Sequence, residues 1–90
     1  MQHKWYVYML RCSDESIYTG ITTDVERRYK EHVSGKAKGA KYTRAHTPVR
    51  IDAVIGAETR QEASKLEYAI KQMSRQEKED LIKQVKTEHE

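Results

Sequence analysis

Three short motifs of the form Ser/Thr-x-x-Glu constrain the fold of this chain most, because each one marks the start of a helix. In such a capping box, the hydroxyl accepts the backbone N–H of the glutamate, whose carboxylate accepts the N–H of the serine or threonine. Apolar residues recur at helical spacing after each motif. The sequence therefore predicts helices over residues 24–34, 60–73 and 75–87, opened by Thr23 with Glu26, Thr59 with Glu62, and Ser74 with Glu77.

Each predicted helix has one apolar face, which we expect to be buried against the rest of the protein. Two tyrosines at core spacing are interpreted as packing residues. The expected inward residues are Val25, Tyr29 and Val33 in the first helix, Ala63, Leu66, Tyr68, Ala69, Ile70 and Met73 in the second, and Leu81, Ile82 and Val85 in the third.

Three other segments have the composition of β-strands. Residues 5–12 and 17–22 are rich in aromatic and branched side chains, and the polar residues 13–16 between them predict a hairpin turn. Residues 48–56 alternate apolar side chains, and residues 35–46 before them are expected to form a basic loop. The predicted fold is α/β (α+β): one domain over residues 1–90, with a three-stranded antiparallel sheet flanked by three helices in the order β-β-α-β-α-α.

Composition excludes several classes of protein. Ninety residues suffice for one modest hydrophobic core. Charged residues make up 34% of the chain and its mean hydropathy is −0.96, which excludes a membrane span. Cys12 is the single cysteine, so an internal disulfide and a cysteine-rich zinc site are excluded. Because no apolar signal segment precedes the first strand, we expect a cytoplasmic protein.

Positive charge is concentrated in one part of the chain. Residues 27–50 contain eight lysines and arginines and a single acid, Glu31, although the net charge of the whole chain is only +3. A surface of this kind attracts a polyanion in a salt-dependent manner. The run also fits a solvated loop that keeps the protein soluble, or a contact with an acidic protein partner. Its position next to Arg28 and His32 favours nucleic acid.

Several polar residues could form a reactive site. Arg28 and His32 lie one turn apart, beside the apolar stripe of their predicted helix, and therefore border a cleft. Tyr8 and Tyr18 lie on the two strands of the predicted hairpin. The chain has six tyrosines and no phenylalanine, which indicates a polar pocket because buried tyrosine hydroxyls need hydrogen-bond partners. Together these side chains supply a proton acceptor, a cation and a hydrogen-bond donor for cutting a phosphodiester.

Glu67 has two interpretations. Lys71 follows it by four residues, which is the spacing of a helix ion pair. Apolar neighbours on either side place Glu67 at the margin of the core, where it could instead offer an oxygen ligand to Mg²⁺. A single carboxylate would leave that ion mostly hydrated, as Mg²⁺ prefers.

The ordered set of these residues resembles the GIY-YIG nuclease family over residues 5–82. Tyr6-Val7-Tyr8 matches the first motif, with Tyr6 in place of glycine, and Tyr18-Thr19-Gly20 matches the second. Arg28-x-x-x-His32 and Glu67 match the later polar positions of the family. The run Gly39-Ala40-Lys41-Tyr42-Thr43-Arg44 is similar to the small stand-alone bacterial branch, the YhbQ-like proteins. The chain contains no asparagine, although some homing enzymes of the family use one.

The resemblance implies a Mg²⁺-dependent or Mn²⁺-dependent DNA endonuclease that is weakly sequence-specific or structure-selective, with a role in DNA repair or recombination. It implies Tyr8 as general base with Tyr18 in support, Arg28 on the pentavalent phosphate, His32 as hydrogen-bond donor and Glu67 as metal ligand. A tyrosine base needs nearby positive charge, because about one phenol in a thousand is ionised at pH 7. Arg28 and the metal would supply that charge.

Contacts with DNA are expected from the basic run. We expect a monomer that does not associate with membranes, and a dimer stays open as a way to cut both strands. Two alternatives stay open: a nucleic-acid-binding module of the same fold without activity, and a protein-interaction domain. The expected nucleic-acid-binding residues are Arg27, Lys36, Lys38, Lys41, Tyr42 and Arg44.

Overall fold

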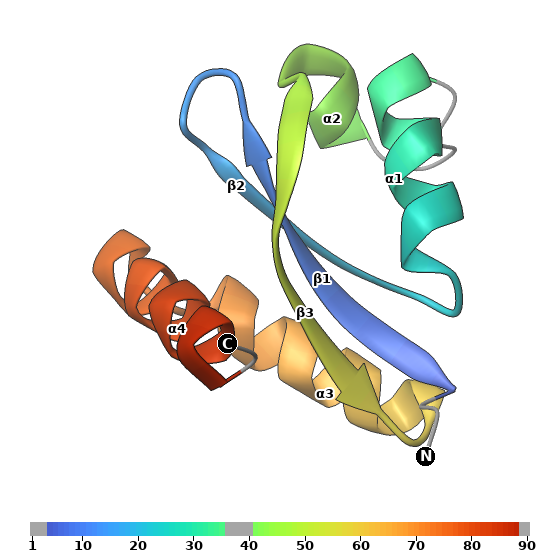
Figure 1. The fold of residues 1–90 in the computed structure, drawn as a ribbon, viewed down its shortest axis with the longest axis vertical. Coiled ribbons are helices and arrows are strands. Elements are labelled where there is room, and N and C mark those ends of the chain that lie inside the picture. Colours follow the sequence, from blue (N-terminus) through green and yellow to red (C-terminus); the bar gives the residue numbers. More distant parts are fainter. Residues whose placement is uncertain (1–3, 36–40, 89–90) are drawn as a thin grey trace.

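A computed structural model describes residues 4–35 and 41–88 of the chain. Three strands and three longer helices follow one another in the predicted order β-β-α-β-α-α, which is confirmed (Figure 1). One additional turn of helix lies within the segment expected to be a basic loop. In chain order the elements are β1 (Trp5–Cys12), β2 (Ile17–Thr22), α1 (Val25–Ser34), α2 (Lys41–Ala45), β3 (Pro48–Ala57), α3 (Arg60–Lys71) and α4 (Arg75–Glu88).

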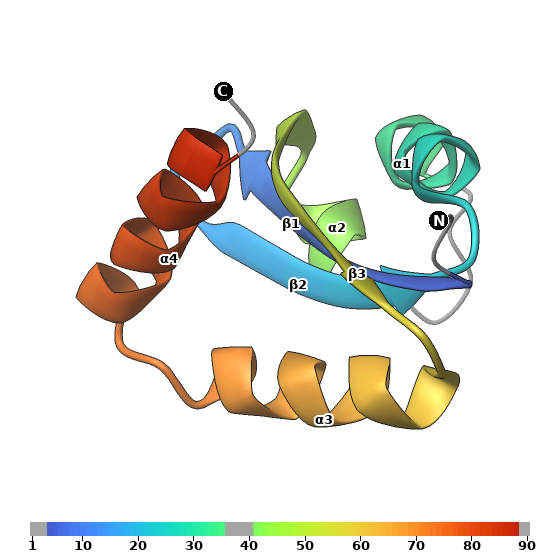
Figure 2. The same ribbon diagram turned by 60° about the horizontal axis from the view of Figure 1, so that its bottom comes forward.

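The three strands form one antiparallel sheet in the order β2-β1-β3, with β1 at its centre. Val7 and Met9 of β1 lie in the main apolar core with residues of α3 and α4. Because side chains alternate along a strand, Tyr8 lies on the opposite face, where it meets α1. Figure 2 shows α3 below the strands and α1 above them. The sheet therefore separates an apolar core from a polar, aromatic cluster.

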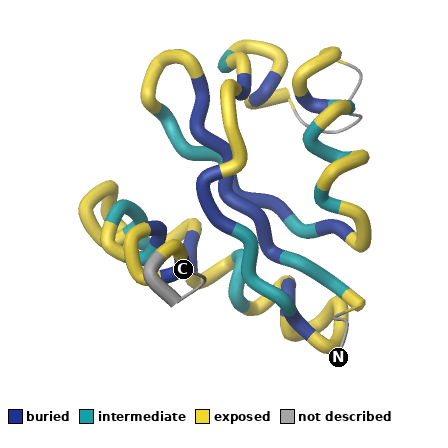
Figure 3. The backbone as a smooth tube through the Cα atoms, viewed as in Figure 1, coloured by how far each residue is buried: buried dark blue, intermediate teal, exposed yellow. Residues whose placement is uncertain are grey.

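Burial is concentrated in β1 and in single faces of the helices. The central part of the sheet is buried, whereas the outer surfaces of α3 and α4 are exposed (Figure 3). The residues of the apolar core are Val7, Met9, Ala53, Ala57, Ala63, Ile70, Ile82 and Val85. No helix among the described residues is long and apolar enough to cross a membrane.

Some predicted inward positions point outward. Val33 is 48% exposed, whereas His32 is only 1% exposed. α1 is therefore turned about one residue further than its apolar pattern indicates, because a polar side chain on this helix meets the sheet. On α3 the buried positions are Ala63 and Ile70; Tyr68 is 68% exposed and Ala69 is also exposed, so both expectations were wrong.

The predicted capping boxes are formed to different degrees. Ser74 and Glu77 bond reciprocally at the start of α4, as expected. Thr59 accepts the N–H of Glu62 at α3, but the Glu62 carboxylate accepts from the backbone N–H of residue 58 instead. At α1 the cap is Asp24 rather than Thr23, because the Asp24 carboxylate accepts the N–H of Arg27.

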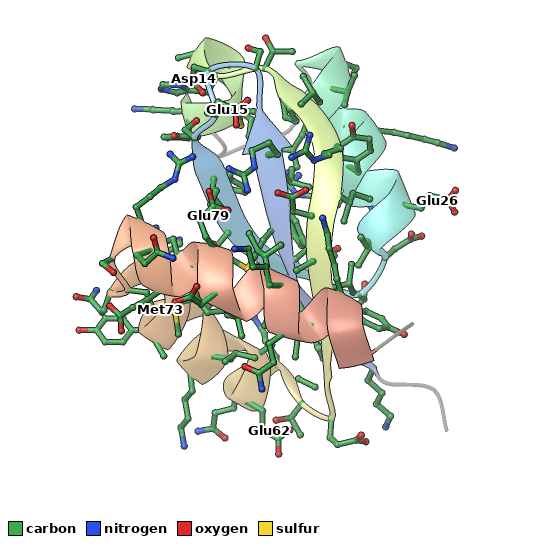
Figure 4. All side chains as sticks on the ribbon, turned by 60° about the vertical axis from the view of Figure 1, so that its left-hand side comes forward. Asp14, Glu15, Glu26, Glu62, Met73 and Glu79 are labelled. Atoms are coloured by element: carbon green, nitrogen blue, oxygen red, sulfur yellow. The ribbon has the colours of Figure 1, made fainter. Side chains whose placement is uncertain are left out.

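A buried ionic network joins β1, β3 and α4. Arg11, 5% exposed, donates from Nε to Asp52 at 2.8 Å and through both terminal nitrogens to Glu79, at 3.1 and 2.5 Å. Glu79 projects from α4 toward the strands (Figure 4). The β1–β3 register shifts between Met9 and Leu10, which pair with Ala53 and Ile51, so that Asp52 between them is the extra residue of a bulge. At this bulge Asp52 has no partner in the strand register, and its carboxylate bonds Arg11.

We expect Asp52→Asn to lower the free energy of unfolding by about 2 kcal/mol, because it removes a charged hydrogen-bond acceptor from a buried arginine. Burial opposes ionisation of Asp52, but hydrogen bonds from Arg50 and Arg11 outweigh it and lower the pKa of Asp52. The carboxylate therefore stabilises the fold above its unfolded pKa of about 3.9 and less as pH falls below that. Urea unfolding at pH 7 and pH 3 measures both effects.

Glu15→Gln is the matched control. The Glu15 carboxylate lies 3.8 Å from Arg11 and its side chain is 73% exposed, so its loss should cost less than about 0.5 kcal/mol. Equal effects of the two variants at pH 7 would contradict a special role for the buried pair.

Candidate functional site

Tyr8 lies across a glycine of the neighbouring strand. The β1–β2 register places Tyr8 opposite Gly20. A Cβ atom at Gly20 would lie 2.5 Å from the Tyr8 hydroxyl oxygen and 2.7 Å from its Cζ, both closer than real contacts allow. Any other residue at position 20 would displace the phenol ring. The glycine of the second sequence motif therefore has a steric function: it makes room for the tyrosine of the first.

A chain of two hydrogen bonds connects the sheet to α1 and α2. The Tyr8 hydroxyl lies 2.9 Å from His32 Nε2, and His32 Nδ1 lies 2.7 Å from the Thr43 hydroxyl. All three side chains are buried, at 2%, 1% and 4% exposure. His32 is thus fully bonded inside the protein, rather than bordering an open cleft as the sequence predicted. A buried imidazole with both nitrogens bonded has one orientation and one position.

His32 is neutral at physiological pH. Burial, together with the nearby positive charge of Arg28, lowers the pKa of His32 to about 4, against a smaller opposing effect of Glu31. A neutral imidazole has one N–H, so one of its two hydrogen bonds is donated and the other accepted. With the proton on Nδ1, His32 donates to Thr43 and accepts the Tyr8 hydroxyl.

Tyr8 is harder to ionise than a free tyrosine. Burial raises the pKa of Tyr8, and the neighbouring Tyr18 adds to that effect. Arg28 acts in the opposite direction, through a hydrogen bond and its charge, but does not outweigh burial. As expected, Arg28 favours the ionised form of Tyr8. Within the protein alone, however, its effect on the pKa is smaller than that of burial.

Tyr18 and Arg28 complete a compact group around Tyr8. The Tyr18 ring centroid lies 5.0 Å from that of His32 and 6.2 Å from that of Tyr8. Arg28 lies on the same helix as His32. It donates to Glu31 at 3.0 Å, and this bond restrains the position of its guanidinium. The structure therefore brings together four of the five residues expected to carry the chemistry.

Exposed aromatic and basic side chains extend from this group along α2. Tyr42 is 37% exposed and stacks between Tyr18, at 5.9 Å, and His46, at 4.1 Å. His46 in turn bonds Asp14 in the β1–β2 turn, and the pKa of Asp14 falls to about 2 because of bonds from Ser16 and His46. The position of Tyr42 is therefore fixed within the protein, with part of its ring left in contact with solvent.

The basic residues predicted to bind nucleic acid divide by position. Arg27 is exposed on α1, and Lys41 and Arg44 are exposed on α2. Lys36 and Lys38 lie outside the described residues.

Glu67 comes from α3, which packs on the other face of the sheet from α1 but whose first residue, Arg60, lines a pocket together with Arg28 at the end of β2. The Glu67 carboxylate lies 3.4 Å from Lys71. Among the described residues no group of three or more His, Cys, Asp or Glu side chains could hold a metal. The donor set still fits Mg²⁺, which commonly takes one or two carboxylates and completes its shell with water and substrate phosphate. Glu67, 24% exposed, is open to such a hydrated ion.

Several residues of the site carry no signal in the sequence. Thr43 bonds His32 from α2, eleven residues away along the chain, and neither helical nor strand spacing relates the two. His46 and Asp14 come together across 32 residues. Gly20, by contrast, already belongs to the second sequence motif, and a glycine inside a strand indicates a close approach of another group.

Comparisons with known proteins place these residues in a family. Residues 4–80 match the model of the GIY-YIG catalytic domain. The UPF0213 protein H16_B0156 of Cupriavidus necator is 54% identical over 70 residues, covering 78% of this chain and 74% of the relative. The UPF0213 protein BH0048 of Halalkalibacterium halodurans is 52% identical over 77 residues, covering 86% and 80%.

Two solved structures are similar to this chain in both fold and sequence. The solution NMR structure of BH0048 from Bacillus halodurans has a TM-score of 0.56 at 51% identity, with 88% of this chain and 82% of that chain covered. The solution NMR structure of the protein EF2693 from E. faecalis has a TM-score of 0.62 at 42% identity, with 100% and 92% covered.

We expect His32 to stay neutral down to about pH 4, which NMR titration of its ring protons measures directly. Its folded pKa lies below the unfolded value of about 6.5, so its neutral form stabilises the fold above pH 6.5. That contribution should be lost as pH falls from 6.5 toward 4. A His32 resonance that titrates near pH 6.5 would contradict the buried, bonded imidazole.

Proposed function

This chain belongs to the GIY-YIG family, and we propose on that premise that it is a Mg²⁺-dependent endonuclease that hydrolyses phosphodiester bonds in DNA. The observation that carries the proposal is the hydrogen-bonded series Tyr8–His32–Thr43 with Arg28 beside it. A neutral base held against a buried phenol, next to a cation, can remove a proton and stabilise negative charge beside a phosphate.

The raised pKa of Tyr8 favours a relay over a preformed phenolate. The attacking water would give a proton to the Tyr8 oxygen as the Tyr8 proton passes to His32 Nε2, so that no free phenolate accumulates. This direction needs the tautomer with the proton on Nδ1, in which His32 donates to Thr43 and Nε2 is left as the acceptor. The low pKa of His32 makes the transfer unfavourable in the free protein, and the negative charge of the bound phosphate would offset this.

Arg28 and Glu67 have the remaining roles in the proposed reaction. The Arg28 guanidinium would stabilise the charge that develops on the pentavalent phosphorus. Glu67 would hold a hydrated Mg²⁺, or Mn²⁺, and a bound ion of this kind supplies charge neutralisation for the leaving 3′ oxygen. Tyr18, against both Tyr8 and His32, would position the water. The products would carry 5′-phosphate and 3′-hydroxyl ends.

DNA would lie across the exposed faces of α1 and α2. Arg27, Lys41 and Arg44 supply exposed positive charge, and Tyr42 offers an aromatic ring next to Tyr18. Contacts of this kind recognise the backbone and stack on any base, so cutting would be weakly sequence-specific or selective for DNA structure. Such an activity would suit DNA repair or recombination.

We expect Tyr8→Phe to reduce DNA cleavage by about 10²–10⁴-fold, as is typical when a general base is lost. The ring remains over Gly20, so the fold should be retained, although His32 loses a buried partner at a cost of about 1–3 kcal/mol. Single-turnover cleavage of a labelled duplex measures the rate.

Two control variants separate the possible tyrosine roles. Tyr68→Phe, at an exposed position on α3, should cut at the wild-type rate. Tyr18→Phe should lose less activity than Tyr8→Phe if it only positions water. Full activity in Tyr8→Phe together with an inactive Tyr18→Phe would reverse their roles, and full activity in both would exclude a tyrosine base.

We expect Glu67→Gln to abolish Mg²⁺-dependent cleavage while DNA affinity stays the same or rises slightly, because a negative charge leaves the anion-binding site. Lys71→Gln is the matched control, since it breaks the same ion pair without removing a carboxylate. Equal behaviour of the two variants in cleavage would reduce Glu67 to a helix ion pair. A wild-type protein that binds DNA but never cuts it would support the inactive binding module, and no DNA binding would favour a protein-interaction domain.

A further inference from the structure

A basic pocket lies beside the site, between the start of α1 and the start of α3. It has a volume of about 470 Å³ and its lining includes Arg27, Arg28 and Arg60, with Glu31 as the one acid. Trp5 and Ile21 give it an apolar wall, and Thr22 and Thr23 contribute polar atoms. Three guanidinium groups against one carboxylate leave the pocket with an excess of positive charge.

Arg60 is placed for an incoming ligand. Its guanidinium carbon lies 5.6 Å from the centroid of the Trp5 ring, at a distance typical of a cation–π contact. It makes no ion pair with any carboxylate in the part of the chain that the structure describes, in contrast to Arg27 and Arg28, which both pair with Glu31. An arginine supported by an aromatic ring keeps its fork of N–H donors directed outward, and that fork matches phosphate geometry.

The pocket is continuous with the site because they share a residue. Arg28 lines the pocket and also hydrogen-bonds Tyr8. A nucleic-acid strand with one phosphate at Arg28 would therefore have its next phosphate near Arg27 and Arg60. No local pattern indicates this pocket, since Arg60 and Trp5 lie 55 residues apart in the sequence and outside the basic run.

We propose that this pocket binds the phosphodiester next to the one that is cut, with Arg60 as its principal ligand and Trp5 as the ring that holds Arg60 in place. The inference rests on the proposed nuclease function and extends it. It assigns α3 a direct part in holding DNA and fixes the direction in which the strand leaves the site: from Tyr8, past Arg28, toward the start of α3.

Binding of a short DNA duplex in the absence of divalent metal tests the pocket without cleavage. Anisotropy of labelled DNA gives the affinity at several salt concentrations, and the emission of Trp5, the single tryptophan of the chain, reports on the pocket itself. We expect Arg60→Gln to weaken binding about tenfold and to lower the salt slope by about one phosphate contact. Arg60→Lys, which keeps the charge, should recover part of the affinity.

Lys65→Gln is the matched control, because it removes one positive charge from an exposed position of the same helix outside the pocket. It should bind within about twofold of wild type. In the wild type, DNA should change Trp5 emission at the same concentrations that raise the anisotropy.

The outcomes separate this inference from the nuclease proposal. Should the wild type cut DNA while Arg60→Gln and Lys65→Gln bind it equally well, or should Trp5 emission stay constant at saturation, the pocket is not a phosphate site and the nuclease proposal stands. If the wild type neither binds nor cuts DNA, the nuclease proposal fails and the pocket assignment fails with it.

Discussion

The hydroxyl of one buried tyrosine sets the geometry on the functional side of this protein. Tyr8 is almost completely buried, and an unbonded hydroxyl there would cost about 1–3 kcal/mol. The imidazole of His32 satisfies it, and Thr43 satisfies the imidazole. To make these bonds, α1 must turn a histidine rather than a valine toward the sheet, α2 must form a turn of helix against it, and β2 must carry a glycine under the phenol ring. Four elements thus take their relative positions from the two hydrogen bonds and the close packing that bury this side chain.

The other face of the sheet is held together differently. Apolar packing of α3 and α4 on Val7 and Met9 supplies the core, and Arg11 adds a buried ionic link from the central strand to β3 and α4. Both networks are built on β1, with alternate residues of one strand serving opposite faces. The central strand is therefore both the structural support of the apolar core and the position from which Tyr8 reaches the site.

The electrostatics of the site connect its structure to its proposed chemistry. The burial that fixes Tyr8 and His32 also disfavours the charged form of each side chain. The neutral pair is therefore better suited to a concerted proton transfer than to holding a charge. Positive charge is supplied at the rim instead, by Arg28 and by the exposed side chains of α1 and α2. The proposed pocket around Arg60 extends that rim to α3, so that DNA would be held from both sides of the sheet edge formed by β2.

Much of the fold could be predicted from the sequence. Strand alternation and the Ser/Thr-x-x-Glu motifs fixed the order of the elements and most of their limits, because these signals depend on neighbouring residues only. The identity of Tyr8, Tyr18, Arg28 and His32 as one group followed from their resemblance to a family. The sequence could not place Thr43, the Asp14–His46 contact or Arg60 beside Trp5, since no local pattern relates residues so far apart. It also misjudged Val33 and Tyr68, because the rotation of a helix depends on what it packs against. Local spacing in the sequence determined the helices and strands. Tertiary packing decided which charged and hydroxyl groups are buried together, and this burial determined which side chains meet and how readily each one gains or loses a proton.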